Sequence, residues 1–366
     1  MTDILISGAG VAGPTLAYWL ARNGFRPTVV ERSQGLRSSG NPVDVRGPAF
    51  PVAEQMGILP ALREHQTRAK AMRVLGIDGK PLARVPMGAQ RAGSQEVELP
   101  RGELASVLYA AARDHAEFLF DETITGLHQD EGGVDVTFDR AGPRRFDLVI
   151  GADGLHSTTR RLVFGPEADF VRHMGVYVAT LPLGEPAREP DEILMYNTPG
   201  RLLSIHPANG DALAAFIFRG PAIPGFDHRD MDQHKKIVLD AYAGIGWRVP
   251  ELLDRVRTAT DLYFDSVSQV RLPAWSTGRV ALVGDAAACL SLFGEGSSLA
   301  MSAGYTLAAT LAEAPHDVAF ARYETEHRKL VEPKQRNVSR AAGLIVPKTR
   351  LGIGVRNLAA RVGGTL

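Results

Sequence analysis

Three short apolar runs of this chain each end in a glycine-containing turn, and two of the three turns carry an acid. The turns are Gly8–Gly13, Asp153-Gly154 and Gly284-Asp285. Glycine lets a backbone turn tightly and approach a bound group closely. Because the turns are spread over about 280 residues, we expect distant segments of one domain to hold a single nucleotide cofactor.

The segment around the first turn has the order expected of a dinucleotide site. Residues 4–7 are typical of a buried strand, residues 11–23 have helical spacing, and a strand over 27–31 ends in Glu31. A helix N-terminus offers unpaired N–H groups to a pyrophosphate, and an acid about 20 residues further on accepts ribose hydroxyls. Such an acid fits FAD and NAD equally well.

Two further motifs decide between these cofactors. Residues 147–160 read DLVIGADG followed by Ser157 and Arg160, and residues 278–287 read GRVALVGDAA. Together with Gly8-x-Gly10-x-x-Gly13, they resemble the class A FAD-dependent monooxygenases, which include para-hydroxybenzoate hydroxylase, the aromatic-polyketide hydroxylases and the tetracycline-inactivating monooxygenases. The resemblance covers essentially the whole chain. Its compact length, without a thioredoxin-like tail, is most similar to the tetracycline-inactivating members.

The resemblance implies an α/β fold: a Rossmann-like FAD-binding domain of the GR2 type, an inserted mixed or antiparallel β-sheet substrate domain, and C-terminal helices. Short strands between Gly/Pro turns over about 171–268 and a helical pattern over about 296–344 agree with it. We expect a discontinuous FAD-binding domain over 1–70, 98–170 and 269–320. The substrate-binding domain is expected over 71–97 and 171–268, and a C-terminal helical segment over 321–366.

Carried over by matching motif, the resemblance assigns cofactor roles to individual residues. Gly8, Gly10 and Gly13 would cradle the FAD pyrophosphate. Glu31 would bind the adenosine ribose, and Asp285 the ribityl chain. The other expected cofactor residues are Val11, Ala12, Arg32, Arg46, Arg101, Asp153, Gly154, Gly284, Gly296, Ser297 and Ser298. Two alternatives stay open, since Arg46 alone is also consistent with a surface cation and Asp153 with a residue that caps a turn.

The family's chemistry belongs to the flavin. The resemblance implies that NAD(P)H reduces FAD, which reacts with dioxygen to give a C4a-hydroperoxide that hydroxylates the substrate or inserts oxygen into it. No metal is expected, because the ten histidines include no close ligand pair. The alternative is a FAD-binding protein of the same fold without oxygenase activity, acting as a cyclase, a ligand-binding protein or a scaffold.

That alternative rests on one departure from the family pattern. After Gly284-Asp285-Ala286-Ala287 the family usually has His and then Pro-Pro or Ser-Pro, whereas this chain has Ala288 and, near a usual proline, Leu292. Proline would fix φ in this loop, and leucine leaves it more freedom. Cys289 is expected to be a small buried residue.

On the substrate side, we expect a largely apolar wall that suits a hydrophobic, aromatic or polycyclic molecule. The predicted wall residues are Tyr196, Leu203, Phe216, Phe218, Phe293 and Gly294. His206 is a weak candidate for a catalytic base or a phenolate ligand, with a purely structural histidine as the alternative. The sequence identifies no other catalytic side chain.

Composition restricts the remaining possibilities. Lys plus Arg and Asp plus Glu number 41 each among 366 residues, so the chain has no overall bias toward nucleic acid or an anionic membrane. A single cysteine excludes an internal disulfide, and neither a signal peptide nor a transmembrane run is visible. We expect a cytoplasmic monomer or homodimer with neither a nucleic-acid nor a membrane partner.

Overall fold

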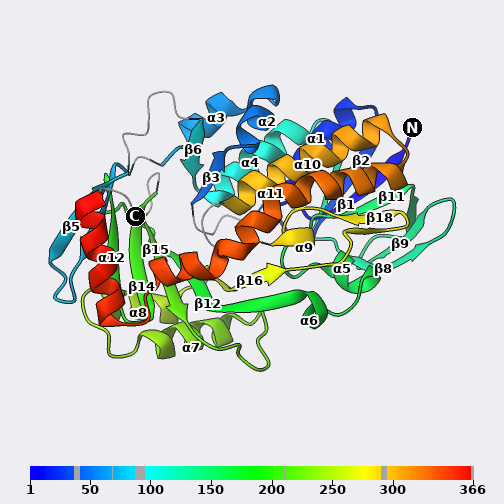
Figure 1. Ribbon diagram of the computed structural model, residues 1–366. Coiled ribbons are helices and arrows are strands. Elements are labelled where there is room, and N and C mark those ends of the chain that lie inside the picture. The colour runs from blue at the N-terminus through cyan, green and yellow to red at the C-terminus, as the bar shows by residue number, and fades with distance from the viewer. Residues whose placement is uncertain (37–41, 68, 88–94, 209–211, 290–294, 364–366) are drawn as a thin grey trace.

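The computed structural model describes residues 1–36, 42–67, 69–87, 95–208, 212–289 and 295–363, with only the backbone of 337–341 and 359–363. Its first layer is a six-stranded sheet (Figure 1). In spatial order the strands are β17 (Ser276–Thr277), β18 (Val280–Leu282), β11 (Leu148–Gly151), β1 (Asp3–Ser7), β2 (Arg26–Glu31) and β7 (Glu117–Phe120). All neighbouring pairs are parallel except β17 with β18. Buried apolar strands of this kind carry nucleotide sites at their carboxyl ends.

Helices cover this sheet and pack closely on one another. The main ones are α1 (Ala12–Arg22), α4 (Arg101–Ala112), α10 (Glu295–Glu313) and α11 (His316–Ile345). A Cβ at Gly304 would lie 3.0 Å from the backbone nitrogen of Leu16, so α10 meets α1 almost backbone to backbone. This contact brings the N-terminal ends of two helices to one edge of the sheet.

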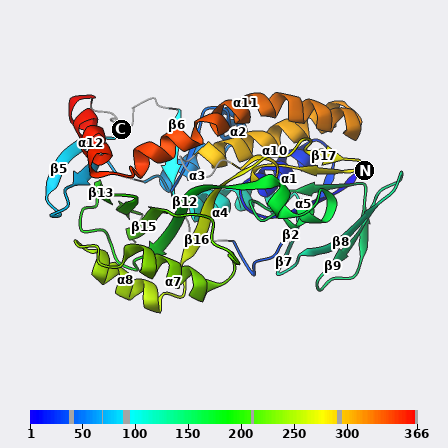
Figure 2. The ribbon, with the colours of Figure 1, turned by 60° about the horizontal axis from the view of Figure 1, so that its bottom comes forward.

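The second layer is a seven-stranded mixed sheet. In spatial order its strands are β16 (Tyr263–Val270), β12 (Val171–Pro182), β15 (Ala212–Arg219), β14 (Arg201–Pro207), β13 (Glu192–Thr198), β4 (Ala71–Leu75) and β5 (Pro81–Pro86). Helices α7 (Met231–Tyr242) and α8 (Val249–Thr258) lie under one face, as Figure 2 shows. On the opposite face the end of α11 packs against Val176, Leu202 and Ile217. The sheet is therefore covered on both sides.

Smaller elements complete the fold. Strands β3 (Val43–Arg46) and β6 (Glu96–Leu99) form an antiparallel ribbon, and β8 (Ile124–Gln129), β9 (Val134–Phe138) and β10 (Arg144–Phe146) form a three-stranded sheet. The remaining helices are α2 (Ala49–Gln55), α3 (Leu59–Glu64), α5 (Thr158–Val163), α6 (Glu167–Phe170), α9 (Asp285–Ala288) and α12 (Arg350–Gly363). Among the described helices none is long and apolar enough to cross a bilayer. The predicted fold class is confirmed, with a parallel sheet, an inserted mixed sheet and C-terminal helices.

Candidate active site

The three glycine-containing turns meet at the carboxyl ends of three adjacent strands. Strand β1 pairs with β11, and β11 pairs with β18, so the segments that follow them share one edge of the sheet. Gly8 has a φ of 109°, and a Cβ there would lie 2.5 Å from the carbonyl oxygen of Ala152. A Cβ at Gly284 would lie 3.1 Å from the Cβ of Ala12. Glycine at both positions therefore lets the turns come together.

Within the first turn the glycines have different surroundings. A Cβ at Gly13 would lie 1.9 Å from the carbonyl oxygen of Gly8, so Gly13 is needed for the turn to close on α1. Gly10 is exposed, and a Cβ there would meet nothing within 4 Å. The turn is thus packed tightly on the protein side and open on the other, where α1 begins with Val11 and Ala12. This is the shape that a pyrophosphate needs for backbone contact at a helix N-terminus.

Glu31, at the end of β2, faces the same turn. One carboxylate oxygen accepts a hydrogen bond from the Ala9 backbone nitrogen at 2.9 Å, and the other accepts one from the Ser33 backbone nitrogen at 2.9 Å. The sequence pattern predicted an acid at this place, and these two bonds fix its orientation beside the turn. Its contact with an adenosine ribose remains a prediction.

Asp153 holds the second turn in place. Its carboxylate accepts hydrogen bonds from the Thr159 backbone nitrogen and hydroxyl, both at 2.9 Å, from the Ser157 hydroxyl, and from the Ser7 hydroxyl at 3.3 Å. These contacts tie the turn after β11 both to the start of α5 and to β1. Of the two interpretations of Asp153, the contacts favour the turn cap. Gly154, with a φ of 78°, faces open space beside it.

Asp285 opens the short helix α9 directly after the third turn. Burial raises the pKa of its carboxyl, and the positive charge of Arg101 opposes that rise. Arg101 is the first residue of α4, more than 180 residues earlier in the chain. The structure thus brings these two predicted cofactor residues near each other, and their contacts with FAD remain predictions.

The first turn of α10 adds Gly296, Ser297 and Ser298 to this region. The Ser298 hydroxyl donates a hydrogen bond to the Asp44 carbonyl at 2.7 Å and accepts one from the Arg46 backbone nitrogen at 3.0 Å. The Arg46 guanidinium forms ion pairs with Glu295 at 3.3 Å and with Glu96 at 3.4 Å. Arg46 is therefore not a lone surface cation but part of the joint between α10 and the β3–β6 ribbon.

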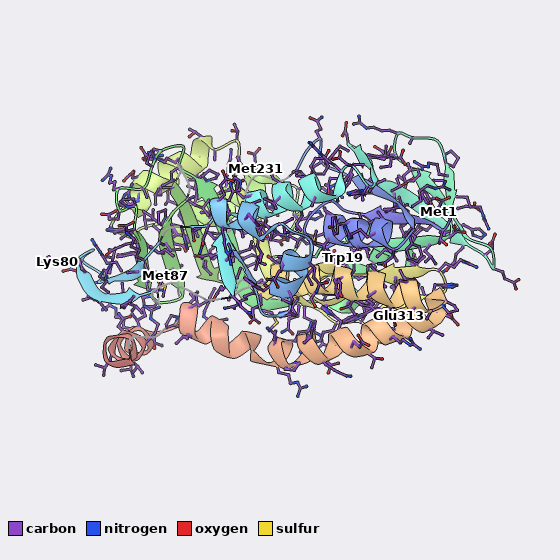
Figure 3. The ribbon with its side chains drawn as sticks, turned by 90° about the horizontal axis from the view of Figure 1, so that it is seen from above. Met1, Trp19, Lys80, Met87, Met231 and Glu313 are labelled. Atoms are coloured by element: carbon purple, nitrogen blue, oxygen red, sulfur yellow. The ribbon has the colours of Figure 1, made fainter. Side chains whose placement is uncertain are left out.

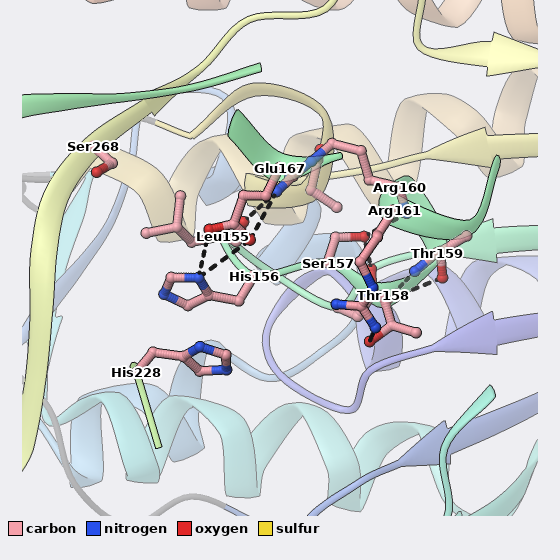
Figure 4. A network of polar contacts seen from close by, with 12 residues as sticks. Leu155, His156, Ser157, Thr158, Thr159, Arg160, Arg161, Glu167, His228 and Ser268 are labelled. Atoms are coloured by element: carbon pink, nitrogen blue, oxygen red, sulfur yellow. Dashed lines mark hydrogen bonds and ion pairs between the residues drawn. The ribbon is translucent and has the colours of Figure 1, made fainter. Parts of the chain in front are cut away.

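A histidine network that we did not predict lies beside the second turn (Figure 4). The His156 ring contacts Glu167 through Nδ1 at 3.0 Å and Asp265 of β16 through Nε2 at 3.2 Å. Burial alone would lower the pKa of His156, but the hydrogen bonds to Asp265 and Glu167 raise it to about 9. His156 is therefore a cation at neutral pH, and it joins the second turn to the second sheet.

His228 stacks on this cation. Its ring centroid lies 4.0 Å from that of His156, with 9° between the ring planes. Burial and the His156 charge lower the pKa of His228 to about 4, and the positive charge of Arg32 contributes to the same shift. The neutral ring of His228 thus stacks on the charged ring of His156. Arg32, a predicted cofactor residue, lies near this pair.

The residues present fit FAD at the joined turns. An open glycine backbone and a helix N-terminus suit a pyrophosphate, and the carboxylate at the end of β2 and the acid at the start of α9 suit hydroxyl groups. A family model described as an FAD binding domain matches residues 1–334. The chain belongs to this family.

Similar proteins identify the class of enzyme within this family. A flavin-dependent monooxygenase of Legionella longbeachae is 35% identical over 340 residues, which span 91% of this chain and 87% of the relative. An uncharacterised protein of Mycobacterium tuberculosis is 41% identical over 347 residues, 93% of both chains. The crystal structure of tetracycline destructase Tet(55) superposes with a TM-score of 0.86 at 33% identity, covering 100% of this chain and 96% of that one. The chain is a FAD-dependent oxidoreductase of the monooxygenase class.

The structure corrects the predicted substrate wall of this monooxygenase. Four of the wall residues belong to the hydrophobic cluster that packs on α7 and α8, where all are at most 4% exposed: Tyr196, Leu203, Phe216 and Phe218. The prediction of alternate strand residues on one face was sound, but the chosen face is wrong. Helices cover that face, so these side chains are core residues. Phe293 and Gly294 lie outside the described residues.

The opposite face of the sheet carries the other alternate residues, among them His206 of β14. Its Nε2 contacts the Ser204 hydroxyl at 2.9 Å, and its Nδ1 has no hydrogen-bond partner among the described residues. Burial lowers the pKa of His206 to about 4, so the ring is neutral at pH 7. Cys289, just after α9, is buried as expected, and residues 290–294 of the atypical loop lie outside the described residues.

Proposed function

We propose that this monooxygenase uses NAD(P)H and dioxygen to hydroxylate, or insert oxygen into, an aromatic or polyketide-like small molecule. The observation that carries the proposal is the meeting of the three turns around the open backbone of Gly10. Likeness to a tetracycline destructase structure over the full chain supports a polycyclic substrate. Bound FAD supplies the redox chemistry, because none of the side chains described above can activate dioxygen.

The protein's own residues bind, orient and shield. In the proposal, the Gly8–Gly13 turn and the α1 N-terminus hold the pyrophosphate, and Glu31 binds the adenosine ribose. Asp285 and the first turn of α10 hold the ribityl side. In the proposal, packing between the two sheets would limit the access of water to the bound cofactor.

Substrate contacts come from the sheet face opposite α7 and α8. The end of α11 covers Leu202 and Ile217 on this face, and the described residues beside them include the partly buried Met195 and the polar Ser204 and His206. A neutral imidazole with a free ring nitrogen can hydrogen-bond a phenol or an enol. We propose that His206 orients such a hydroxyl, in a molecule that is otherwise apolar. A cytoplasmic location remains part of the proposal.

The test begins with the purified protein loaded with FAD. A flavoprotein absorbs at about 450 nm, and a monooxygenase consumes NAD(P)H faster when its substrate is bound. We expect both, the second with hydroxylated polycyclic aromatics in a substrate panel. A chain that cannot be loaded with FAD would overturn the proposal. Tight FAD binding with no ligand-stimulated NAD(P)H consumption would favour the non-oxygenase alternative instead.

A further inference from the structure

The chain is neutral overall, but its charged residues are unevenly distributed along the sequence. Residues 333–366 contain seven basic residues and no Asp or Glu: Lys334, Arg336, Arg340, Lys348, Arg350, Arg356 and Arg361. The preceding 332 residues therefore hold 34 basic and 41 acidic residues. Lys334 and Arg336 form ion pairs with Glu295 and Glu332, and Arg356 is buried, so Lys348 and Arg350 carry the described exposed charge of this segment. Charge asymmetry of this kind is consistent with an anionic partner. This segment includes the end of α11 and all of α12.

Helix α12 is fixed to the protein by one face. Arg356 and Asn357 are buried, and Arg356 donates hydrogen bonds to the Ile345 carbonyl at 3.4 Å and to the Asn357 side chain at 2.8 Å. The helix contacts β5 and β13 of the second sheet. It is therefore a docked element with a defined inner and outer face.

The outer face of α12 is apolar, the reverse of an ordinary surface helix. Leu351 is 78% exposed, and Val355 and Leu358 are each 62% exposed. Their spacing of four and three residues places them in one stripe along the helix. Lys348 and Arg350, both exposed, lie at the N-terminal end of the stripe. An outward apolar stripe with a basic end is typical of a helix that lies in a membrane interface.

A second apolar point lies at the same end of the molecule. In the β4–β5 hairpin, Ile77 is 63% exposed and Leu82 39% exposed. Figures 1 and 3 both show this hairpin, which carries Lys80, beside α12 and far from Met1. The exposed apolar side chains thus gather at the end of the molecule that also carries Lys348 and Arg350, whereas Lys80 of the hairpin pairs with Asp78.

We propose that this end of the monooxygenase binds the surface of an anionic lipid bilayer, with α12 lying in the interface and its apolar stripe inserted. Charge decides between lipid and a second copy of the chain. A two-fold interface would bring the same basic, acid-free segment of each copy together, and like charges would repel. Anionic headgroups instead attract each nearby Lys or Arg. The proposal goes beyond the monooxygenase function and does not depend on it.

Vesicle flotation of the FAD-loaded protein tests the proposal. The probes are vesicles of pure phosphatidylcholine and vesicles of equal parts phosphatidylcholine and phosphatidylglycerol. We expect at least about tenfold more protein on the anionic vesicles, and release at about 1 M salt, where charges are screened beyond roughly 3 Å. Replacing the stripe by Leu351→Ser, Val355→Ser and Leu358→Ser is expected to abolish flotation while FAD content is unchanged.

A matched variant controls for lost surface hydrophobicity. It carries Leu162→Ser, Val318→Ser and Leu330→Ser, three side chains that are 36–40% exposed on α5 and α11. This control is expected to float like the parent protein. Equal flotation of the stripe variant and the control would overturn the proposal, as would failure of the parent to bind anionic vesicles. Light scattering that shows a dimer which the stripe variant dissociates would overturn it in favour of a second copy.

Discussion

At the scale of single residues, His156 forms a charged contact between the segment after β11 of the first sheet and β16 of the second sheet. Its ring bridges Glu167 and Asp265, and the side chains of His156 and Asp265 are only 16% and 17% exposed. A cation between two partly buried carboxylates stabilises the fold as long as it stays protonated. The sequence could not show this network, because Asp265 lies 109 residues away from His156 and no motif pairs them.

Replacing His156 should therefore lower the free energy of unfolding by an amount that depends on pH. The pKa of His156 is raised from 6.5 to about 9, so its stabilisation is complete below pH 6.5 and is lost as the pH rises through about 9. We expect His156→Leu to lower the free energy of unfolding by about 2 kcal/mol at pH 7. Denaturant unfolding at pH 7 and at a pH above 9 checks this. A loss of equal size at both pH values would contradict the assigned charge.

Asp44 should behave in the opposite way. Burial and the nearby Glu98 raise the pKa of its carboxyl from 3.8 to about 6, against the effect of Arg46. A raised acid pKa means that stability is lost as the pH rises from about 4 through 6. We expect Asp44→Asn to be more stable than the parent by up to about 3 kcal/mol at pH 8 and equal at pH 4. A less stable variant at pH 8 would show that the Arg46 ion pair dominates.

At the scale of elements, the decisive feature is which loops the strand order brings together. Short apolar runs before each turn predicted parallel buried strands, and the structure places β1, β11 and β18 side by side. What the pattern did not reveal is which face of the second sheet packs on α7 and α8. Both faces are apolar because helices pack on both, so the alternation of Phe216 and Phe218 with Ile217 offered no choice.

Two glycine substitutions in the first turn should separate folding from cofactor binding. Gly13→Ala would force a Cβ to 1.9 Å from the Gly8 carbonyl, and we expect it to destabilise the apoprotein by about 2 kcal/mol or more. Gly10→Ala meets no protein atom, so the apoprotein should keep its stability while FAD affinity falls at least about tenfold. Thermal melts and FAD titration measure the two effects. Unchanged FAD binding by Gly10→Ala would contradict the assigned pyrophosphate site.

The hydrogen bonds that Ser298 forms between α10 and β3 can be tested by a third substitution. Ser298 is 3% exposed and bonds both the Asp44 carbonyl and the Arg46 nitrogen. Ser298→Ala leaves both groups without this partner, and we expect it to cost about 1–2 kcal/mol of stability. The neighbouring Ser297→Ala, at a residue for which no such bridge is described, serves as the control. Equal effects of the two changes would argue against the bridge.

At the scale of the whole molecule, the protein combines two large sheets, one nearly all parallel and one mixed. The strand order of the parallel sheet collects the three glycine turns, and we propose that the substrate binds at the face of the mixed sheet opposite α7 and α8. The sequence predicted the two kinds of sheet, since strand period and glycine turns are local signals. Contacts between the layers, such as His156 with Asp265, depend on tertiary packing and had no local signal.

Oxygen transfer from labelled dioxygen tests the central claim most directly. The FAD-loaded protein is supplied with NAD(P)H, with isotopically labelled dioxygen and with a hydroxylated polycyclic aromatic that stimulates NAD(P)H consumption. The mass of the product is then measured by mass spectrometry. A monooxygenase is expected to place one labelled atom in each product molecule, with unlabelled oxygen when only water carries the label. A product without label from dioxygen, or NAD(P)H consumption that yields no oxygenated product with any substrate, would contradict the account.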